Sequence, residues 1–161
     1  MKSTLYYIFI GIVVIISLLV GLTGHSLPWG RQLLALESAS MVSTIPPGSL
    51  ILIQDEPWYQ AGDIVTFWAK VNNKEELVTH RIIAVGGNVY VTKGDDNQQS
   101  DRELVQPRLI EGRLVAFFPL LGRIILFLQS KPGLGLLMVP ITLILYQQIR
   151  YLVHLFMRPH S

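Results

Sequence analysis

An uncharged apolar segment near the N-terminus constrains this chain more than any other feature. Residues 5–22 carry no charged side chain, and most of them are Ile, Val or Leu. At 1.5 Å per residue, a helix of about 18 residues covers most of the roughly 30 Å hydrocarbon core of a bilayer. The alternative is a cleaved signal peptide, whose apolar run is normally only about 7–15 residues and ends at a small-x-small site. The run is long and Leu-Thr-Gly-His after it is a poor cleavage site, so we predict a retained anchor.

A second apolar segment lies near the C-terminus, at residues 133–149, between Lys131-Pro132 and Arg150. Its length, about 17 residues, is at the short end of what spans a bilayer. Pro140 lies within it, which a membrane helix tolerates better than a soluble one. Only 15% of the chain is charged, and its apolar residues concentrate at the two ends. This distribution predicts a membrane protein with one polar domain between two spans.

The charges of the two tails predict the orientation in the membrane. Lys2 lies in the first tail, Arg150 and Arg158 lie in the last, and neither tail is acidic. Basic tails favour the cytoplasmic side. We therefore expect a multi-pass plasma-membrane protein with an extracytoplasmic domain. The predicted parts are a tail, an anchor, the domain, a second transmembrane helix and a tail, at residues 1–4, 5–22, 23–132, 133–149 and 150–161.

The polar body has the pattern of a small, mainly antiparallel β domain. Apolar and β-branched runs alternate with turn signals, and Gly86-Gly87-Asn88 is typical of a hairpin turn. We interpret residues 25–36 as a linker, with three leucines along the membrane surface. Residues 113–122 either lie against the membrane or form a central strand, and a helical segment follows at 123–129. The remaining predicted strands lie within residues 50–53, 64–68, 77–85 and 89–92.

Composition excludes several classes of function. The chain has no cysteine, which excludes disulfides, thiolate catalysis and zinc–thiolate sites. Its formal net charge is +2, and no basic run is interleaved with aromatic residues, so we expect no nucleic-acid partner. The loop at 95–97 lacks the spacing and terminal Glu of an EF-hand, and Lys93-Gly94 lacks the rest of a P-loop. We therefore expect neither a metal nor a cofactor.

The β body offers few side chains for catalysis. A serine nucleophile needs a base to take its proton, and the base needs a group to orient it. Ser40 lies just beyond the anchor, and His80 is the one histidine of the body. Asp95, Asp96 and Asp101 follow in the next loop and are candidates for orienting the imidazole. Taken singly, each of these residues also fits an ordinary turn, strand or solvated loop.

Four short segments in order resemble a known family. They are similar to the ordered boxes of type I signal peptidases, in the endoplasmic-reticulum and archaeal branch that also occurs in some Gram-positive bacteria. That branch has His where the common bacterial enzymes have a lysine base. The resemblance covers residues 36–122. Its boxes are Ser38-Ala39-Ser40-Met41, Gly62-Asp63-Ile64-Val65, Thr79-His80-Arg81 and Lys93-Gly94-Asp95-Asp96-Asn97, with Asp101 beyond.

The resemblance implies a role for each matching position. Ser40 matches the nucleophile, His80 the general base and Asp101 the acidic member of a triad. Asp95 matches a second important aspartate, and the Ser38 hydroxyl with the Ser40 N–H matches the oxyanion hole. The implied activity is a membrane-bound serine endopeptidase that removes signal peptides from exported preproteins. Such an enzyme cuts after small residues, and its partners are preproteins, membrane lipid and the export machinery. We expect a shallow apolar cleft to bind the substrate as an added strand.

The chain also departs from the family pattern. The family usually has Gly at Ala39, Pro at Ser43, Asp at Ser49 and Asn at Asp96. None of these changes removes a proposed catalytic group, although a turn that needs positive φ would be restricted by Ala39. The departures motivate an alternative, a catalytically weak or inactive scaffold or assembly subunit of the same fold. A third possibility is a pilus or envelope structural protein, which would not depend on His80.

Overall fold

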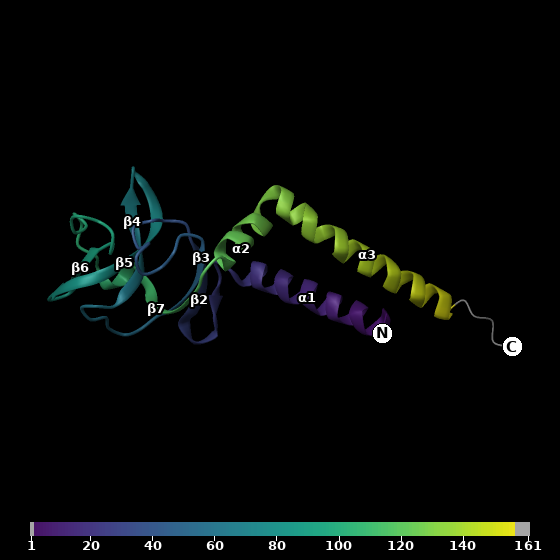
Figure 1. Cartoon of the computed structure of the whole chain (residues 1–161). Coiled ribbons are helices and arrows are strands. Elements are labelled where there is room, and N and C mark those ends of the chain that lie inside the picture. The colour runs from purple at the N-terminus through teal and green to yellow at the C-terminus, as the bar shows by residue number, and fades with distance from the viewer. Residues whose placement is uncertain (1, 157–161) are drawn as a thin grey trace. The chain divides into compact units, whose positions relative to one another are not determined.

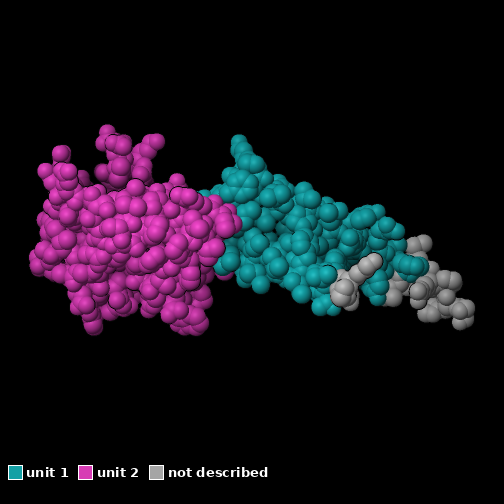
Figure 2. Space-filling model, viewed as in Figure 1, with its two compact units in different colours: residues 1–21, 126–161 teal, residues 22–125 magenta. Residues whose placement is uncertain are grey.

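The computed structural model describes residues 2–156, with side chains from residue 4 to residue 154. The chain divides into two compact units, each described here by itself (Figure 2). One unit comprises residues 1–21 and 126–161, and the other comprises residues 22–125. Met1 and residues 157–161 lie outside the described part of the chain. The predicted tail charge at Arg158 therefore lies there too.

The unit of residues 22–125 is built on one antiparallel sheet, which confirms the predicted mainly β fold (Figure 1). The sheet has seven strands in the order β1-β2-β3-β7-β4-β5-β6, and short 3-10 helices η1 (Pro28–Gly30) and η2 (Pro107–Leu109) precede β2 and β7. The strands are β1 (Ser26–Leu27), β2 (Arg31–Leu36), β3 (Ser49–Gln54), β4 (Ile64–Val71), β5 (Lys74–Gly86), β6 (Val89–Lys93) and β7 (Ile110–Phe118).

Two tight turns set the register of the strand that carries His80. Asn72 and Asn73 join β4 to β5 with φ of 52° and 62°, values that asparagine tolerates better than most residues. Gly87, with φ of 62°, joins β5 to β6. The first turn pairs Val65 with His80 on the neighbouring strands. The imidazole is therefore attached to a strand whose position is fixed by its pairing with β4.

The apolar segment near residues 113–122 provides the central strand of the sheet. Strand β7 lies between β3 and β4, which are much earlier in the sequence. Of the two alternatives, membrane contact or central strand, the structure has the second. Gly112 is required where β7 passes the end of β3, because a Cβ there would lie 2.8 Å from the carbonyl carbon of Gln54.

The segment predicted as a linker contains a strand of this sheet, so that prediction is wrong for residues 31–36. Strand β2 pairs with β3 from Arg31↔Gln54 to Leu36↔Ser49. Leu36 is buried and belongs to a core cluster rather than to a membrane surface. The consecutive leucines lack the alternation of a half-exposed strand. A continuous apolar run of this kind cannot be assigned to a strand by periodicity alone.

Two clusters of buried side chains form the core. One contains aromatic and aliphatic residues of β4, β5, β6 and β7 and of nearby loops, and the other packs β2, β3 and the start of β4 against the turn after β2. Met41 and Ile45 come from that turn and are fully buried. Burying such a side chain contributes about 1.5–3 kcal/mol. The turn that contains Ser40 is therefore anchored in the core by two residues that follow the serine.

The other unit contains two long helices, α1 (Lys2–Leu22) and α3 (Lys131–Phe156). The predicted span 5–22 lies within α1, and 133–149 lies within α3, which extends further at both ends. Both helices are long and apolar enough to cross a membrane, and very few of their described side chains are buried. Helix α2 (Leu121–Gln129) begins at the end of the β unit, where a helical segment was predicted. Ser130 separates α2 from α3.

Candidate active site

Ser40 lies in the turn after β2, where a distant loop holds its backbone. The N–H of Asp96 donates to the Ser40 carbonyl at 3.0 Å. The N–H of Asp95 contacts the sulfur of the buried Met41 at 3.2 Å. A Cβ at Gly94 would lie 2.7 Å from the Ser40 carbonyl oxygen and 2.9 Å from its Cβ. Glycine is therefore required at this close approach of the two loops.

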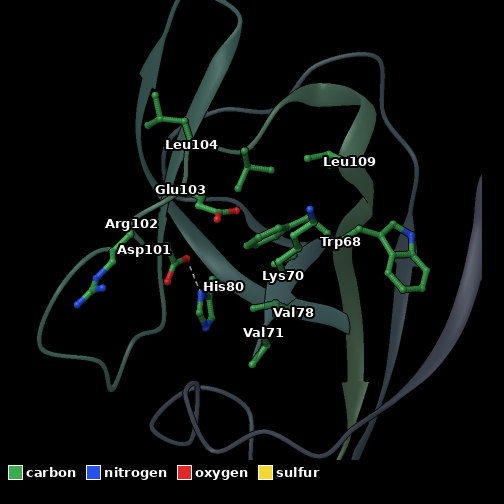
Figure 3. A pocket seen from close by; sticks show the side chains of 13 residues that line it. Trp68, Lys70, Val71, Val78, His80, Asp101, Arg102, Glu103, Leu104 and Leu109 are labelled. Atoms are coloured by element: carbon green, nitrogen blue, oxygen red, sulfur yellow. Dashed lines mark hydrogen bonds and ion pairs between the residues drawn. The ribbon is translucent and has the colours of Figure 1, made fainter. Parts of the chain in front are cut away.

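His80 lies between a hydroxyl and a carboxylate. Its Nε2 is 3.0 Å from Ser40 Oγ, and its Nδ1 is 2.6 Å from Asp101 Oδ2. The residue is 7% exposed, and the edge of its ring packs against Phe67. The structure thus brings together three residues that are far apart in the sequence and that sequence analysis singled out. Figure 3 shows His80 and Asp101 side by side.

The Asp101 carboxylate is fixed by a second hydroxyl. The fully buried Thr92 donates its Oγ1–H to the same Oδ2 at 2.6 Å, and its carbonyl accepts the N–H of Asp101 at 2.9 Å. Burial raises the pKa of Asp101, but hydrogen bonds from His80 and Thr92 more than offset this and leave that pKa below its ordinary value. The carboxylate is therefore ionised at neutral pH.

The ionised carboxylate determines where the protons lie. It can only accept hydrogen bonds, so Nδ1 of His80 carries the proton that faces Asp101. In the neutral imidazole Nε2 is then an acceptor, and the Ser40 hydroxyl donates to it. Since that hydroxyl has one hydrogen, the 2.9 Å contact between Ser38 Oγ and Ser40 Oγ has Ser38 as the donor. This is the arrangement in which a serine oxygen is ready to lose its proton to a base.

The two groups predicted to form the oxyanion hole are hydrogen-bonded to each other. The N–H of Ser40 donates to Ser38 Oγ at 3.2 Å, while the Ser38 hydroxyl is directed at Ser40 Oγ. Ser38 is exposed, so its side chain has room to rotate. A substrate carbonyl would have to replace both contacts to receive these donors.

Asp95 does not contact His80, although sequence analysis placed it among the catalytic candidates. Its two oxygens accept a bidentate pair from Arg81, at 2.9 Å from Nε and 2.7 Å from Nη2, and one also accepts from the Thr44 hydroxyl. The hydrogen bonds from Arg81 hold the pKa of Asp95 below its ordinary value. Arg81 also donates to the Gly62 carbonyl at 2.9 Å. Asp95 therefore ties the turn of Ser40 to strand β5.

Two departures from the family pattern contact each other. Both the N–H and the hydroxyl of Ser43 donate to Asp96 Oδ2, at 2.8 Å and 3.0 Å. Proline at position 43 would have no N–H to give. Ala39 is not among the residues with positive φ, so the turn does not require glycine there. These substitutions preserve the turn that holds Ser40.

The roles of Thr92 and Thr44 and the pairing of Arg81 with Asp95 were not predicted from the sequence. Arg81 follows His80 on β5, and alternation along a strand directs it to the other face. That alternation is readable from the sequence, but its carboxylate partner is not. Thr92 ends an apolar run, and nothing in the local pattern marks its hydroxyl as a partner of Asp101.

Two pockets lie beside these residues. The first, of about 470 Å³, is the β2–β5 groove, which runs between residues of β2 and β5 and reaches Ser38. It is lined by Leu34, Ala35, Leu36, Glu37, Ser38, Ile51, Thr66, Glu76, Leu77 and Thr79. The second, of about 280 Å³, is lined by His80, Asp101, Trp68 and neighbouring side chains and is drawn in Figure 3. Within residues 4–154, no group of three His, Cys, Asp or Glu is arranged to hold a metal ion.

Comparison with known proteins gives one consistent relationship. No family model matches the chain. The signal peptidase complex catalytic subunits SEC11 of Metarhizium acridum and Fusarium vanettenii are each 26% identical to it, with 70% of this chain and 78% of theirs covered. The subunit of the same name from Colletotrichum graminicola is 28% identical, with 63% of this chain and 76% of its own covered. These similarities confirm the resemblance carried by the four boxes.

Proposed function

We infer that this chain, a relative of the endoplasmic-reticulum type of signal peptidase, is a serine endopeptidase that removes N-terminal signal peptides from preproteins. The observation that carries this inference is the hydrogen-bonded series from Ser40 through His80 to Asp101, with distances of 3.0 Å and 2.6 Å. A nucleophile, a base and a group that orients the base are together sufficient for acyl transfer. We assign these three roles to Ser40, His80 and Asp101.

In the first step His80 Nε2 takes the proton of Ser40, and Oγ attacks the carbonyl carbon of the scissile bond. The ionised Asp101 stabilises the imidazolium that results. His80 then protonates the leaving amine, so the mature protein departs and the signal peptide remains as an ester on Ser40. Water, deprotonated by His80, attacks that ester. The signal peptide leaves as a carboxylate, and the proton returns to Ser40 Oγ.

The negative oxygen of each tetrahedral intermediate needs donors. We assign this role to the Ser40 N–H and the Ser38 hydroxyl, the latter after rotation away from Ser40 Oγ. One such donor is typically worth about 3 kcal/mol of barrier. In the free protein the Ser40 N–H donates to Ser38 Oγ, and the Ser38 hydroxyl donates to Ser40 Oγ. Both donors are therefore hydrogen-bonded before substrate binds.

The topology supports binding of the substrate as an added strand in the β2–β5 groove. Residues 34–36 of β2 pair with β3 on one side, and β1 extends only to Gln32 on the other, with a single bridge at Leu33. Residues 74–80 of β5 pair with β4 alone. In the described part of the chain, both edges are thus open beside the groove, and both lead to the catalytic residues. An extended peptide can hydrogen-bond to such edges.

The resemblance further implies small residues at the first and third positions before the cut. For location, we propose two membrane spans, in α1 and α3, with the β unit on the extracytoplasmic face of the plasma membrane. The relatives are named as subunits of a signal peptidase complex. A partner subunit, membrane lipid and the export machinery are the partners that we propose for this chain. No observation favours the inactive scaffold, since the candidate catalytic side chains are present and hydrogen-bonded.

The test is cleavage of a purified preprotein by the detergent-solubilised full chain, with the cut located by mass spectrometry. Ser40→Ala and His80→Ala should each lower the cleavage rate by about 10⁴-fold or more, because each removes a reacting group. Glu103→Gln, in the other pocket, should leave the rate nearly unchanged. Full cleavage by either of the first two variants would exclude this mechanism.

A further inference from the structure

The β2–β5 groove carries two carboxylates and no cation that would balance them. Glu37 and Glu76 line it together with apolar and hydroxyl side chains, and its lining contains no Lys, Arg or His. Within residues 4–154, the ion pairs of the protein involve other carboxylates. Both glutamates are exposed. They are therefore free to interact with whatever occupies the groove.

Both glutamates lie within the length of a short extended peptide from the reacting groups. Glu37 precedes Ser38, whose Oγ is 2.9 Å from Ser40 Oγ. Glu76 lies four positions before His80 on β5, which corresponds to roughly 13 Å along a strand. An extended peptide whose carbonyl reaches Ser40 would therefore pass both carboxylates with its last five or so residues before the cut.

Neighbouring Glu75 provides an internal comparison. Glu75 lines a different pocket, with Trp68, Lys70 and Glu103. The two adjacent glutamates of β5 have the same charge and are both exposed, but of the two only Glu76 is among the residues that line the groove, which reaches Ser38.

We propose that Glu37 and Glu76 make the groove selective for substrates with a basic side chain just before the cleaved bond, and unfavourable for acidic ones there. This inference rests on the proposed function and specifies its substrates. Charges of one sign in a groove focus the field on a ligand. Because both carboxylates are exposed, each should contribute a modest factor, about two- to fivefold in kcat/KM, and that factor should decrease with salt.

The experiment uses the full chain in detergent and a set of signal-peptide substrates with Ala at the first and third positions before the cut. Lys, Gln or Glu is placed in turn at the second, fourth and fifth positions. The wild type should cleave the Lys substrate faster than the Gln substrate, and the Gln substrate faster than the Glu substrate, at one or more positions. Glu37→Gln and Glu76→Gln should each reduce this ratio about two- to fivefold, whereas Glu75→Gln should leave it unchanged.

The same peptides, labelled with a fluorophore, are also titrated against the Ser40→Ala variant to measure binding without cleavage. Equal cleavage of all three substrates, or an equal effect of Glu75→Gln, would overturn the charge selectivity while leaving the peptidase assignment intact. Charge-selective binding without any cleavage by the wild type would support the selectivity and overturn the peptidase assignment. A preference that disappears at high salt would support a direct electrostatic origin.

Discussion

At the scale of single residues, the site depends on hydroxyl groups as much as on the imidazole. Ser38 donates to Ser40 Oγ, and Thr92 donates to the carboxylate that orients His80. Thr92 is fully buried, so its hydroxyl has no alternative partner in solvent. It acts through Asp101, which makes it a positioning residue rather than a catalytic one.

Replacing Thr92 by Val should lower kcat about tenfold, with little change in KM, because Asp101 would hold the imidazole less firmly. It should also cost about 1.5–3 kcal/mol of unfolding free energy at neutral pH, the range for a hydrogen bond to a charged group. The pKa of Asp101 lies below its ordinary value, so its stabilising contribution is present above about pH 4 and is lost as the pH falls through the folded-state pKa. The stability difference should therefore shrink in acid.

Kinetics and chemical denaturation between pH 3 and pH 7 check this prediction. Thr92→Ser keeps the hydroxyl and is the matched control, so it should recover most of the rate. Equal losses in the Ser and Val variants would contradict this prediction, because keeping the hydroxyl would then not restore the rate.

At the scale of the elements, the catalytic turn is positioned by the loop after β6. That loop contributes Gly94 against Ser40, Asp95 to Arg81 and Thr44, and Asp96 to Ser43. The side chains of Met41 and Ile45, which are buried in the core, also anchor the turn. The nucleophile is therefore held between two loops that are more than fifty residues apart in the sequence.

Gly94→Ala should lower the cleavage activity of a protein that remains folded. The new methyl group would lie 2.7 Å from the Ser40 carbonyl oxygen, so the two loops must move apart. A displacement of about 1 Å at a reacting group can lower the rate about 10²-fold. We expect a loss of kcat/KM of that order, measured by preprotein cleavage, in a protein that still shows its β-sheet circular dichroism.

Gly86→Ala is the control for that substitution, because a Cβ there would meet only a Val89 methyl group at 4.0 Å. Its activity should be close to that of the wild type. If Gly94→Ala were equally active, the close approach of Gly94 to Ser40 would not be needed for catalysis.

At the scale of the whole molecule, the proposed topology is open to direct measurement because the chain has no cysteine. Single cysteines can report which side of the membrane each part occupies. Asn73 lies exposed at the turn between β4 and β5. Ser3 and Ser161 belong to the predicted N-terminal and C-terminal tails. Two spans with cytoplasmic tails place Asn73 alone outside.

In intact bacterial cells that express the chain, a membrane-impermeant maleimide should label Asn73→Cys and should not label Ser3→Cys or Ser161→Cys. All three should react once the cells are opened. Labelling of Ser161→Cys in intact cells would show that α3 does not return the chain to the cytoplasm, and the two-span topology would have to be abandoned.

Much of this architecture follows from local patterns. Turn residues such as Gly87 mark hairpins because few other residues adopt positive φ, and alternation marks half-buried strands. The uncharged run of residues 5–22 indicates a membrane helix because burying a charge in lipid is costly. Ser40, His80 and Asp101 could be named in advance because the order of four boxes is preserved through the chain.

Other features depended on contacts between distant segments, which no local pattern encodes. Residue types and the positions of apolar segments can be read directly from the amino-acid sequence. The position of β7 between β3 and β4, the contact of Asp101 with the imidazole and the pairing of Asp95 with Arg81 depend on the folded arrangement of the strands. A carboxylate pairs with whatever donor the packing brings within about 3 Å, and that distance is set by the whole sheet rather than by neighbours in sequence.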